Sequence, residues 1–116
     1  MEKTVYEVKR FSAEIGTKDR KNIKNGCCLL EDVEPETIKK FDTMEEAVEE
    51  LKKHQPSCRY YSNAVPFYEV EEYVVDIHTE DEDGEFLCGS DFDSVYDYTF
   101  NEEYGDIEIT QDSRFF

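Results

Sequence analysis

The sequence of 116 residues has the length of one domain, and its 30 acidic and 13 basic residues give a formal net charge of -17. This excess of acid argues against direct binding to DNA, RNA or anionic membranes, because these ligands are themselves negatively charged. No segment approaches the ~20 apolar residues of a membrane-spanning helix, and residues 1–6 lack the pattern of a signal peptide. We therefore expect a single domain in a cytosol.

The excess charge is confined to the second half of the chain. Residues 1–60 contain 13 acidic and 12 basic residues, whereas residues 61–116 contain 17 acidic residues and one basic residue, Arg114. The second half also holds 12 of the 16 aromatic residues. Disordered acidic tails contain few aromatics. We expect residues 1–116 to form one domain with a nearly neutral N-terminal half and a folded, strongly acidic C-terminal half.

The first third of the chain predicts β-structure around a basic segment. Residues 3–13 alternate in part between apolar and polar side chains and contain β-branched and aromatic residues, which favours a strand. Residues 16–26 form the basic stretch and end in Asn25 and Gly26, a pair that tolerates positive φ and predicts a turn. The apolar residues 27–30 predict a second strand.

The clearest predicted element is a helix over residues 43–54. Thr43 and Glu46 have the spacing of a capping box, in which each side chain satisfies a backbone N–H group of the first turn. Acidic residues at the start and basic residues at the end suit the helix dipole, and Pro56 ends the helix. One apolar stripe follows the helical period, at Met44, Ala47, Val48 and Leu51.

The rest of the chain predicts mostly strands. Four segments have strand composition or alternation: 58–64, 66–79, 85–88 and 106–110. Asp83 and Gly84 predict a hairpin turn after the second of these. Residues 91–103 fit either a short second helix or a strand, because both periods are present. Together the elements predict an α+β fold, an antiparallel β-sheet with one amphipathic helix packed on one face.

The four cysteines and two histidines are the first candidates for metal ligands. His54 and Cys58 have a spacing that could serve zinc, but there is no C-x₂-C pair, and His78 and Cys88 are distant from them. Residues 79–90 place a glycine as an EF-hand loop does, yet the first and twelfth positions lack the required acids. We expect reduced thiols and neither a metal nor another cofactor.

No motif of an enzyme is present. Neither histidine lies in a recognisable catalytic context, and no nucleophile elbow or phosphate-binding glycine loop occurs. With 30 acidic residues, any single pair of carboxylates is uninformative. We expect no catalytic residues and no enzyme. A small ligand-binding domain or enzyme, which would need a concave pocket with convergent polar groups, is an alternative.

The remaining signal is a series of carboxylates, interspersed with aromatics, on the turns and polar faces of the second half. Such an array can enter a basic groove built for nucleic acid, and aromatic side chains can anchor it there. The expected partner-binding residues are Asp81, Glu82, Asp83, Glu85, Asp91, Asp93, Asp97, Glu102, Glu103, Asp106, Tyr96 and Tyr98. The alternative is that the excess acid only keeps a small protein soluble.

Three segments carry a resemblance to known proteins. Residues 41–47 (FDTMEEA), 67–75 (FYEVEEYVV) and 81–86 (DEDGEF) resemble a group of short uncharacterised acidic proteins from gut Firmicutes and their phages and mobile elements. This group has no established catalytic residues, so the resemblance implies no role for any one position. It implies a genomic setting in which small acidic proteins include anti-CRISPR and anti-restriction inhibitors.

Charge and resemblance together predict an inhibitor from a phage or mobile element. We expect it to bind a basic nucleic-acid-handling protein, such as the CRISPR effector nuclease Cas9, and to block nucleic-acid binding or cleavage through an acidic, DNA-mimic-like surface. The basic residues of 18–24 leave open a second kind of contact. The alternative is a protein-interaction or accessory module without inhibitory activity, and a homo-oligomer is compatible with either function.

Overall fold

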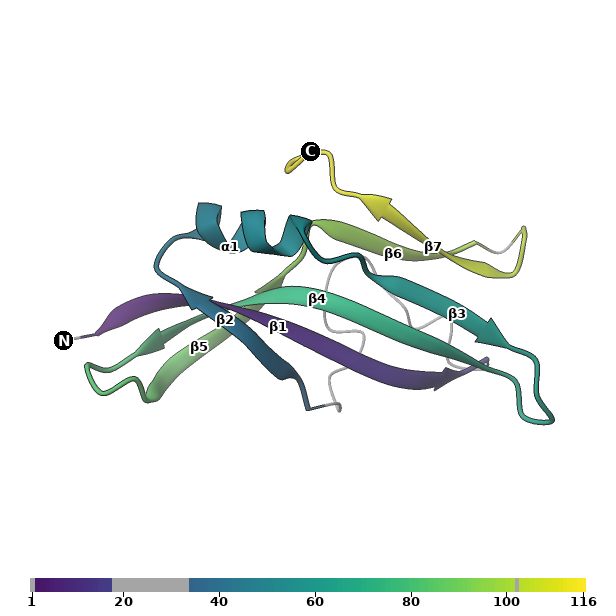
Figure 1. The fold of residues 1–116 in the computed structure, drawn as a ribbon, viewed down its shortest axis with the longest axis horizontal. Coiled ribbons are helices and arrows are strands. Elements are labelled where there is room, and N and C mark those ends of the chain that lie inside the picture. Colours follow the sequence, from purple (N-terminus) through teal and green to yellow (C-terminus); the bar gives the residue numbers. More distant parts are fainter. Residues whose placement is uncertain (1, 18–33, 102) are drawn as a thin grey trace.

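The computed structural model describes residues 2–17, 34–101 and 103–116 (Figure 1). The basic residues 18–24, the turn at Asn25 and Gly26, and the strand predicted at 27–30 lie outside the described residues. Within the described ranges the elements in chain order are β1 (Lys3–Gly16), β2 (Glu36–Phe41), α1 (Met44–Lys52), β3 (Ser57–Tyr61), β4 (Phe67–Glu80), β5 (Phe86–Asp93), β6 (Tyr96–Asn101) and β7 (Asp106–Gln111).

Two strands of 14 residues, β1 and β4, form the centre of the fold. They pair antiparallel over their whole length, from Lys3 opposite Glu80 to Gly16 opposite Phe67. The strand β2 pairs with the outer edge of β1, and β3 and β5 pair with different stretches of β4. This arrangement confirms the predicted antiparallel sheet with one helix, although the helix is a small part of the chain.

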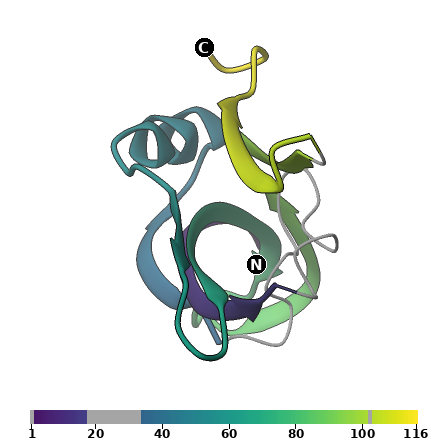
Figure 2. The ribbon, with the colours of Figure 1, turned by 90° about the vertical axis from the view of Figure 1, so that its right-hand side faces the viewer.

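The central strands coil strongly, as expected for long strands with the usual twist (Figure 2). One consequence is that a single apolar core contains side chains from both faces of β4. Tyr68 and Val70 occupy even positions and Tyr73 and Val75 odd ones, yet all four belong to the same buried cluster. In a flat strand these side chains would point to opposite faces. Coiling lets the β6–β7 hairpin cover one end of β4 while α1 covers the other (Figure 1).

The helix α1 confirms the predicted capped and amphipathic element, with slightly shorter ends. Thr43 is the N-cap, and its hydroxyl oxygen accepts from the backbone N–H of Glu46 at 3.3 Å. The same hydroxyl donates to the Glu46 carboxylate at 3.0 Å, so this carboxylate contacts the Thr43 side chain. The apolar stripe is buried at Ala47, Val48 and Leu51.

The second short helix considered for residues 91–103 does not form. The end of β5 and the strand β6 occupy the described part of this segment. A corner at Ser94 separates them: the Ser94 hydroxyl donates to the Tyr73 carbonyl at 3.1 Å and accepts from the Tyr96 N–H at 3.2 Å. The strand β6 then pairs with β7 in a separate two-stranded sheet, which satisfies its backbone groups without a helix.

The other predicted strands are confirmed with shifted ends, and the turn at Asp83 and Gly84 joins β4 to β5. Among the described residues, the one helix has nine residues, and no helix has the length and apolar character needed to cross a membrane.

We expect Leu51→Ala to lower the free energy of unfolding by about 2–5 kcal/mol, because it removes buried methyl groups beneath α1 and leaves a cavity. Urea unfolding followed by circular dichroism measures this loss. Glu49→Ala, on the exposed side of the same helix, is the control and should change stability by about 0.5 kcal/mol or less. Equal effects of the two substitutions would show that α1 is not docked on the sheet.

Candidate functional site

A cluster of charged side chains is buried in the sheet. It lies near the end of the β1–β4 ladder where β2 pairs with β1 and β5 pairs with β4. Glu7 from β1 and Asp76, His78 and Glu80 from β4 are all buried. Buried charges are unfavourable unless they are paired and hydrogen-bonded. Titratable groups gathered in this way are common at functional sites. We call these four residues the buried charged cluster.

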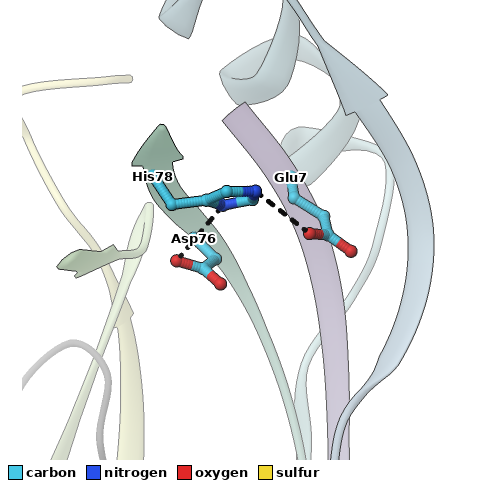
Figure 3. A group of neighbouring side chains, drawn as sticks. All are labelled: Glu7, Asp76 and His78. Atoms are coloured by element: carbon cyan, nitrogen blue, oxygen red, sulfur yellow. Dashed lines mark ion pairs between the residues drawn. The ribbon is translucent and has the colours of Figure 1, made fainter. Parts of the chain in front are cut away.

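Strand period and register bring the cluster together. Asp76, His78 and Glu80 occupy alternate positions of β4, so their side chains share one face. The antiparallel register places Glu7 opposite Asp76 and Val5 opposite His78. Figure 3 shows the side chains of Glu7, Asp76 and His78 directed toward one another across the two strands.

The carboxylates of Asp76 and Glu7 each accept a hydrogen bond from a neighbouring side chain. Oδ2 of Asp76 accepts from the Lys9 ammonium at 2.7 Å. Oε2 of Glu7 accepts from the Thr37 hydroxyl of β2. The other oxygens lie near the imidazole: Oδ1 of Asp76 is 3.7 Å from Nδ1 of His78, and Oε1 of Glu7 is 3.9 Å from Nε2.

The imidazole of His78 is oriented by Glu80. Nε2 of His78 lies 2.6 Å from Oε2 of Glu80, which also accepts from the Lys40 ammonium at 2.8 Å. The hydrogen bond from Lys40, followed by that from His78, holds the pKa of Glu80 below its usual value. Because Glu80 is therefore an acceptor, Nε2 carries the proton of this hydrogen bond. Nδ1 of His78 is buried and has no hydrogen-bond partner.

A β-bulge in β5 lies opposite His78. The pairing of β4 with β5 passes from Ile77 opposite Asp91 to Thr79 opposite Cys88, which leaves two residues of β5 facing one residue of β4. One of them is Gly89, with a φ of 81°, and a Cβ atom there would lie 3.9 Å from the Cα atom of His78. Bulges of this kind are common beside functional sites because they redirect the neighbouring side chains.

The β4–β5 hairpin contains four of the acidic residues that were predicted to bind a partner: Asp81, Glu82, Asp83 and Glu85. Glu82, Asp83 and Glu85 are exposed, and Asp81 is half-buried. Oδ1 of Asp81 accepts from the backbone N–H groups of Asp83 and Glu85, each at 2.9 Å, so this carboxylate shapes the turn. Gly84 completes the turn with a φ of 85°, which favours glycine.

The remaining predicted acids lie elsewhere on the molecule. Asp91 is exposed on β5, while Asp93 and Asp97 are half-buried. Glu103 and Asp106 are exposed in the β6–β7 turn, at the opposite end of the molecule from the β4–β5 hairpin (Figure 1). The longest dimension of the molecule is 52 Å, so the acids of the β4–β5 hairpin and those of the β6–β7 turn do not form one compact group.

The other three residues that were predicted to contact a partner are Glu102, Tyr96 and Tyr98. Glu102 lies outside the described residues. Tyr96 and Tyr98 are 6% and 0% exposed. The expectation that they anchor a partner is wrong, because alternation along β6 turns both rings into the core.

Part of the charge of the acidic half is neutralised by ion pairs with bases of the other half on other strands of the sheet. Three ion pairs join the halves at N–O distances of 2.7–2.8 Å: Lys9 with Asp76, Arg10 with Glu71, and Lys40 with Glu80. Arg10, together with the Tyr73 hydroxyl, holds the pKa of Glu71 below its usual value. The two halves of the sequence differ in net charge, but this difference does not divide the surface into a neutral part and an acidic part.

Among the described residues, His54, Cys58 and Cys88 belong to no group of three potential metal ligands, while Cys27 and Cys28 lie outside the described residues. His54 lies 2.8 Å from Glu50 and stacks on Tyr73, and burial raises the pKa of the Cys58 thiol to about 11. Among the described residues, one group of three potential ligands has atoms within 4.8 Å of one another: Glu7, Asp76 and His78. The signal for this group in the sequence is the alternation of Asp76, His78 and Glu80 along one strand.

Comparisons of the chain with protein-family models, curated proteins and solved structures find no match. The resemblance to small acidic proteins of phages and mobile elements therefore stays a prediction. The proposals below rest on the geometry of the described residues and on the charge of the chain.

A further buried carboxyl, Glu72, gives a pH-dependent prediction. Glu72 is 1% exposed, and its Oε1 has no hydrogen-bond partner. Burial raises the pKa of this carboxyl to about 8. The unfolded chain releases this proton near pH ~4.3, so Glu72 lowers stability as the pH rises from about 4 to 8. We expect Glu72→Gln to raise the free energy of unfolding at pH 8 by roughly 2–5 kcal/mol and to have little effect at pH 4.

Urea unfolding at pH 4, 6 and 8 measures this difference. The exposed Glu69→Gln on the same strand is the control, and it should change stability by about 0.5 kcal/mol or less at each pH. A stabilisation by Glu72→Gln that does not grow with pH would mean that Glu72 is ionised in the folded protein.

Proposed function

We propose that the protein is a non-enzymatic binding protein that inserts the tip of its β4–β5 hairpin into a positively charged groove of a nucleic-acid-handling protein. We define the hairpin tip as residues 81–87. By occupying the groove, the protein competes with DNA or RNA and acts as an inhibitor. A CRISPR effector nuclease such as Cas9 is the partner class that the charge and the resemblance favour.

One observation carries this proposal: the hairpin tip combines acidic and apolar side chains at one end of an elongated molecule (Figure 1). Its four carboxylates are followed at once by Phe86 and Leu87, which are 58% and 42% exposed. Carboxylates attract a basic partner over a distance and speed association, while a buried aromatic ring supplies much of the affinity in many interfaces. Both side chains are exposed beside the charged turn, where they are available to a partner.

The hairpin tip is also held in shape before binding. Asp81 fixes the turn through its two side-chain hydrogen bonds, and its backbone N–H donates to the Glu85 carbonyl at 2.9 Å. The ring of Phe86 packs against the imidazole of the buried His78, with centroids 5.4 Å apart. A surface with a fixed conformation loses less entropy on binding.

The β6–β7 turn is the natural comparison surface. It presents Glu103, Asp106 and the 74% exposed ring of Tyr104 at the other end of the molecule. It contains fewer described carboxylates than the hairpin tip, so we expect it to contribute less to binding of a basic groove. Variants in the two turns therefore distinguish a specific docking site from a general effect of net charge.

We expect the triple variant Glu82→Gln, Asp83→Asn, Glu85→Gln to weaken inhibition of DNA cleavage by the purified Cas9–guide RNA complex at least tenfold. The variant keeps Asp81, so the hydrogen bonds of the turn are preserved. The control pair Glu103→Gln, Asp106→Asn should inhibit almost as well as the unchanged protein. Affinity of the unchanged protein should fall between 50 and 500 mM salt, as ion pairs with a basic groove are screened.

Two results would each contradict a different part of the proposal, the partner or the docking site. Absence of binding and inhibition with Cas9 would reject this partner. Equal inhibition by the triple variant and the unchanged protein would reject the hairpin tip as the docking site.

A further inference from the structure

We propose that Glu7, Asp76 and His78 form a binding site for one divalent transition-metal ion, with Zn²⁺ as the best match to the donor set. One imidazole nitrogen and two carboxylates are ligands that Zn²⁺ commonly takes in proteins. This site is separate from the hairpin tip, so it goes beyond the proposed function and does not depend on it.

The unpartnered nitrogen of His78 is the main argument. The side chain of His78 is 3% exposed, and its Nδ1 has no hydrogen-bond partner. A buried polar atom without a partner is unfavourable and calls for a specific cause. With the proton on Nε2 directed to Glu80, Nδ1 offers a lone pair to the interior of the cluster.

The positions of the three groups suit a shared ion. Atoms of Glu7, Asp76 and His78 that could act as ligands lie within 4.8 Å of one another, and Nδ1 is 3.7 Å from Oδ1 of Asp76. Two ligands of one Zn²⁺ ion at about 2.0–2.2 Å are roughly 3.3–3.6 Å apart in tetrahedral geometry. The His78–Asp76 pair therefore needs a movement of only a few tenths of an ångström, whereas Glu7 faces the other nitrogen of the ring, with Oε1 3.9 Å from Nε2, and must turn to reach an ion at Nδ1 (Figure 3).

Each proposed ligand is already held by a neighbouring group. Glu80 accepts from Nε2 of His78, Lys9 donates to Oδ2 of Asp76, and Thr37 donates to Oε2 of Glu7. Metal-binding histidines usually donate their second nitrogen to a carboxylate or carbonyl in this manner, and such contacts orient the ligands. The cluster thus has the supporting contacts of a metal site as well as the ligands.

The charge balance also favours a cation. Glu7, Asp76 and Glu80 bring three carboxylates, while Lys9 and Lys40 bring two ammonium groups. With a neutral imidazole the group keeps one net negative charge, which a divalent ion more than offsets. Lys9 lies 4.0 Å from Oε1 of Glu7, so it partly screens the site and should lower the affinity below that of a site without a lysine.

A surface recess lies beside Glu80, at the start of the β4–β5 turn. It has a volume of about 430 Å³ and is lined by Lys3, Glu80 and residues 81–84. Glu80 belongs both to this recess and to the hydrogen bond with His78. The acidic residues of the turn attract cations to the recess, and the bulge at Gly89 interrupts the β4–β5 pairing beside His78. A bound ion would join β1 to β4 and stabilise the folded chain.

The test uses full-length protein freed of metal with a chelator and titrated with Zn²⁺ or Co²⁺ in 150 mM salt and 1 mM Mg²⁺, which occupies weak carboxylate sites. Native mass spectrometry gives the stoichiometry and calorimetry the affinity. We expect one equivalent of metal for the unchanged protein. His78→Gln should bind at least tenfold more weakly, whereas His54→Gln, which alters the other histidine, should bind as the unchanged protein does.

A second variant and a direct signal cover the case in which His78→Gln does not fold. Glu7→Gln keeps an acceptor for Thr37 and should also weaken binding. In the unchanged protein, the ¹⁵N resonance of Nδ1 of His78 should shift when Zn²⁺ is added, while the resonances of His54 should not. No stoichiometric binding, binding that survives His78→Gln in a folded variant, or an unshifted Nδ1 resonance would each overturn the proposal.

Discussion

The structure depends on the pairing of β1 with β4 over the whole length of both strands. This ladder joins residues 3–16 to residues 67–80 and provides the edges on which β2, β3 and β5 assemble. Its length also makes it coil, so that α1 and the β6–β7 hairpin can both pack on β4 and close one core. Because this pairing joins residues that are distant in the sequence, the strands form one sheet and not a set of independent hairpins.

The same ladder decides what the unequal charge of the chain can do. Bases from the first half pair with acids from the second on other strands of the sheet, and the buried charged cluster forms where these strands meet. Other acids remain exposed, among them those of the β4–β5 and β6–β7 turns, which lie at opposite ends of the molecule (Figure 1). The charge therefore serves two purposes that composition cannot distinguish: some of it orders the interior around His78, and some of it makes the hairpin tip attractive to a basic partner.

Local signals in the sequence predicted local structure well. A capping box and an apolar stripe located α1, and Asp83 with Gly84 located the β4–β5 turn. Residues 91–103 carried both periods, and pairing with β7, not local preference, made β6 a strand. The buried charged cluster could not be predicted, because Glu7 meets Asp76 only through a register between distant strands. The alternation of polar residues over 76–80 was visible, but an exposed polar face and a buried one have the same period.

The register of β1 against β4 is tested most directly by solution NMR. We expect nuclear Overhauser effects between backbone protons of Val5 and His78 and between those of Glu7 and Asp76, since each pair is directly opposed in the ladder. The amide protons of the two central strands should also be among the slowest to exchange with solvent. Absence of these cross-strand effects, together with fast exchange in residues 3–16, would contradict the pairing and with it the cluster, the core and the position of the hairpin tip.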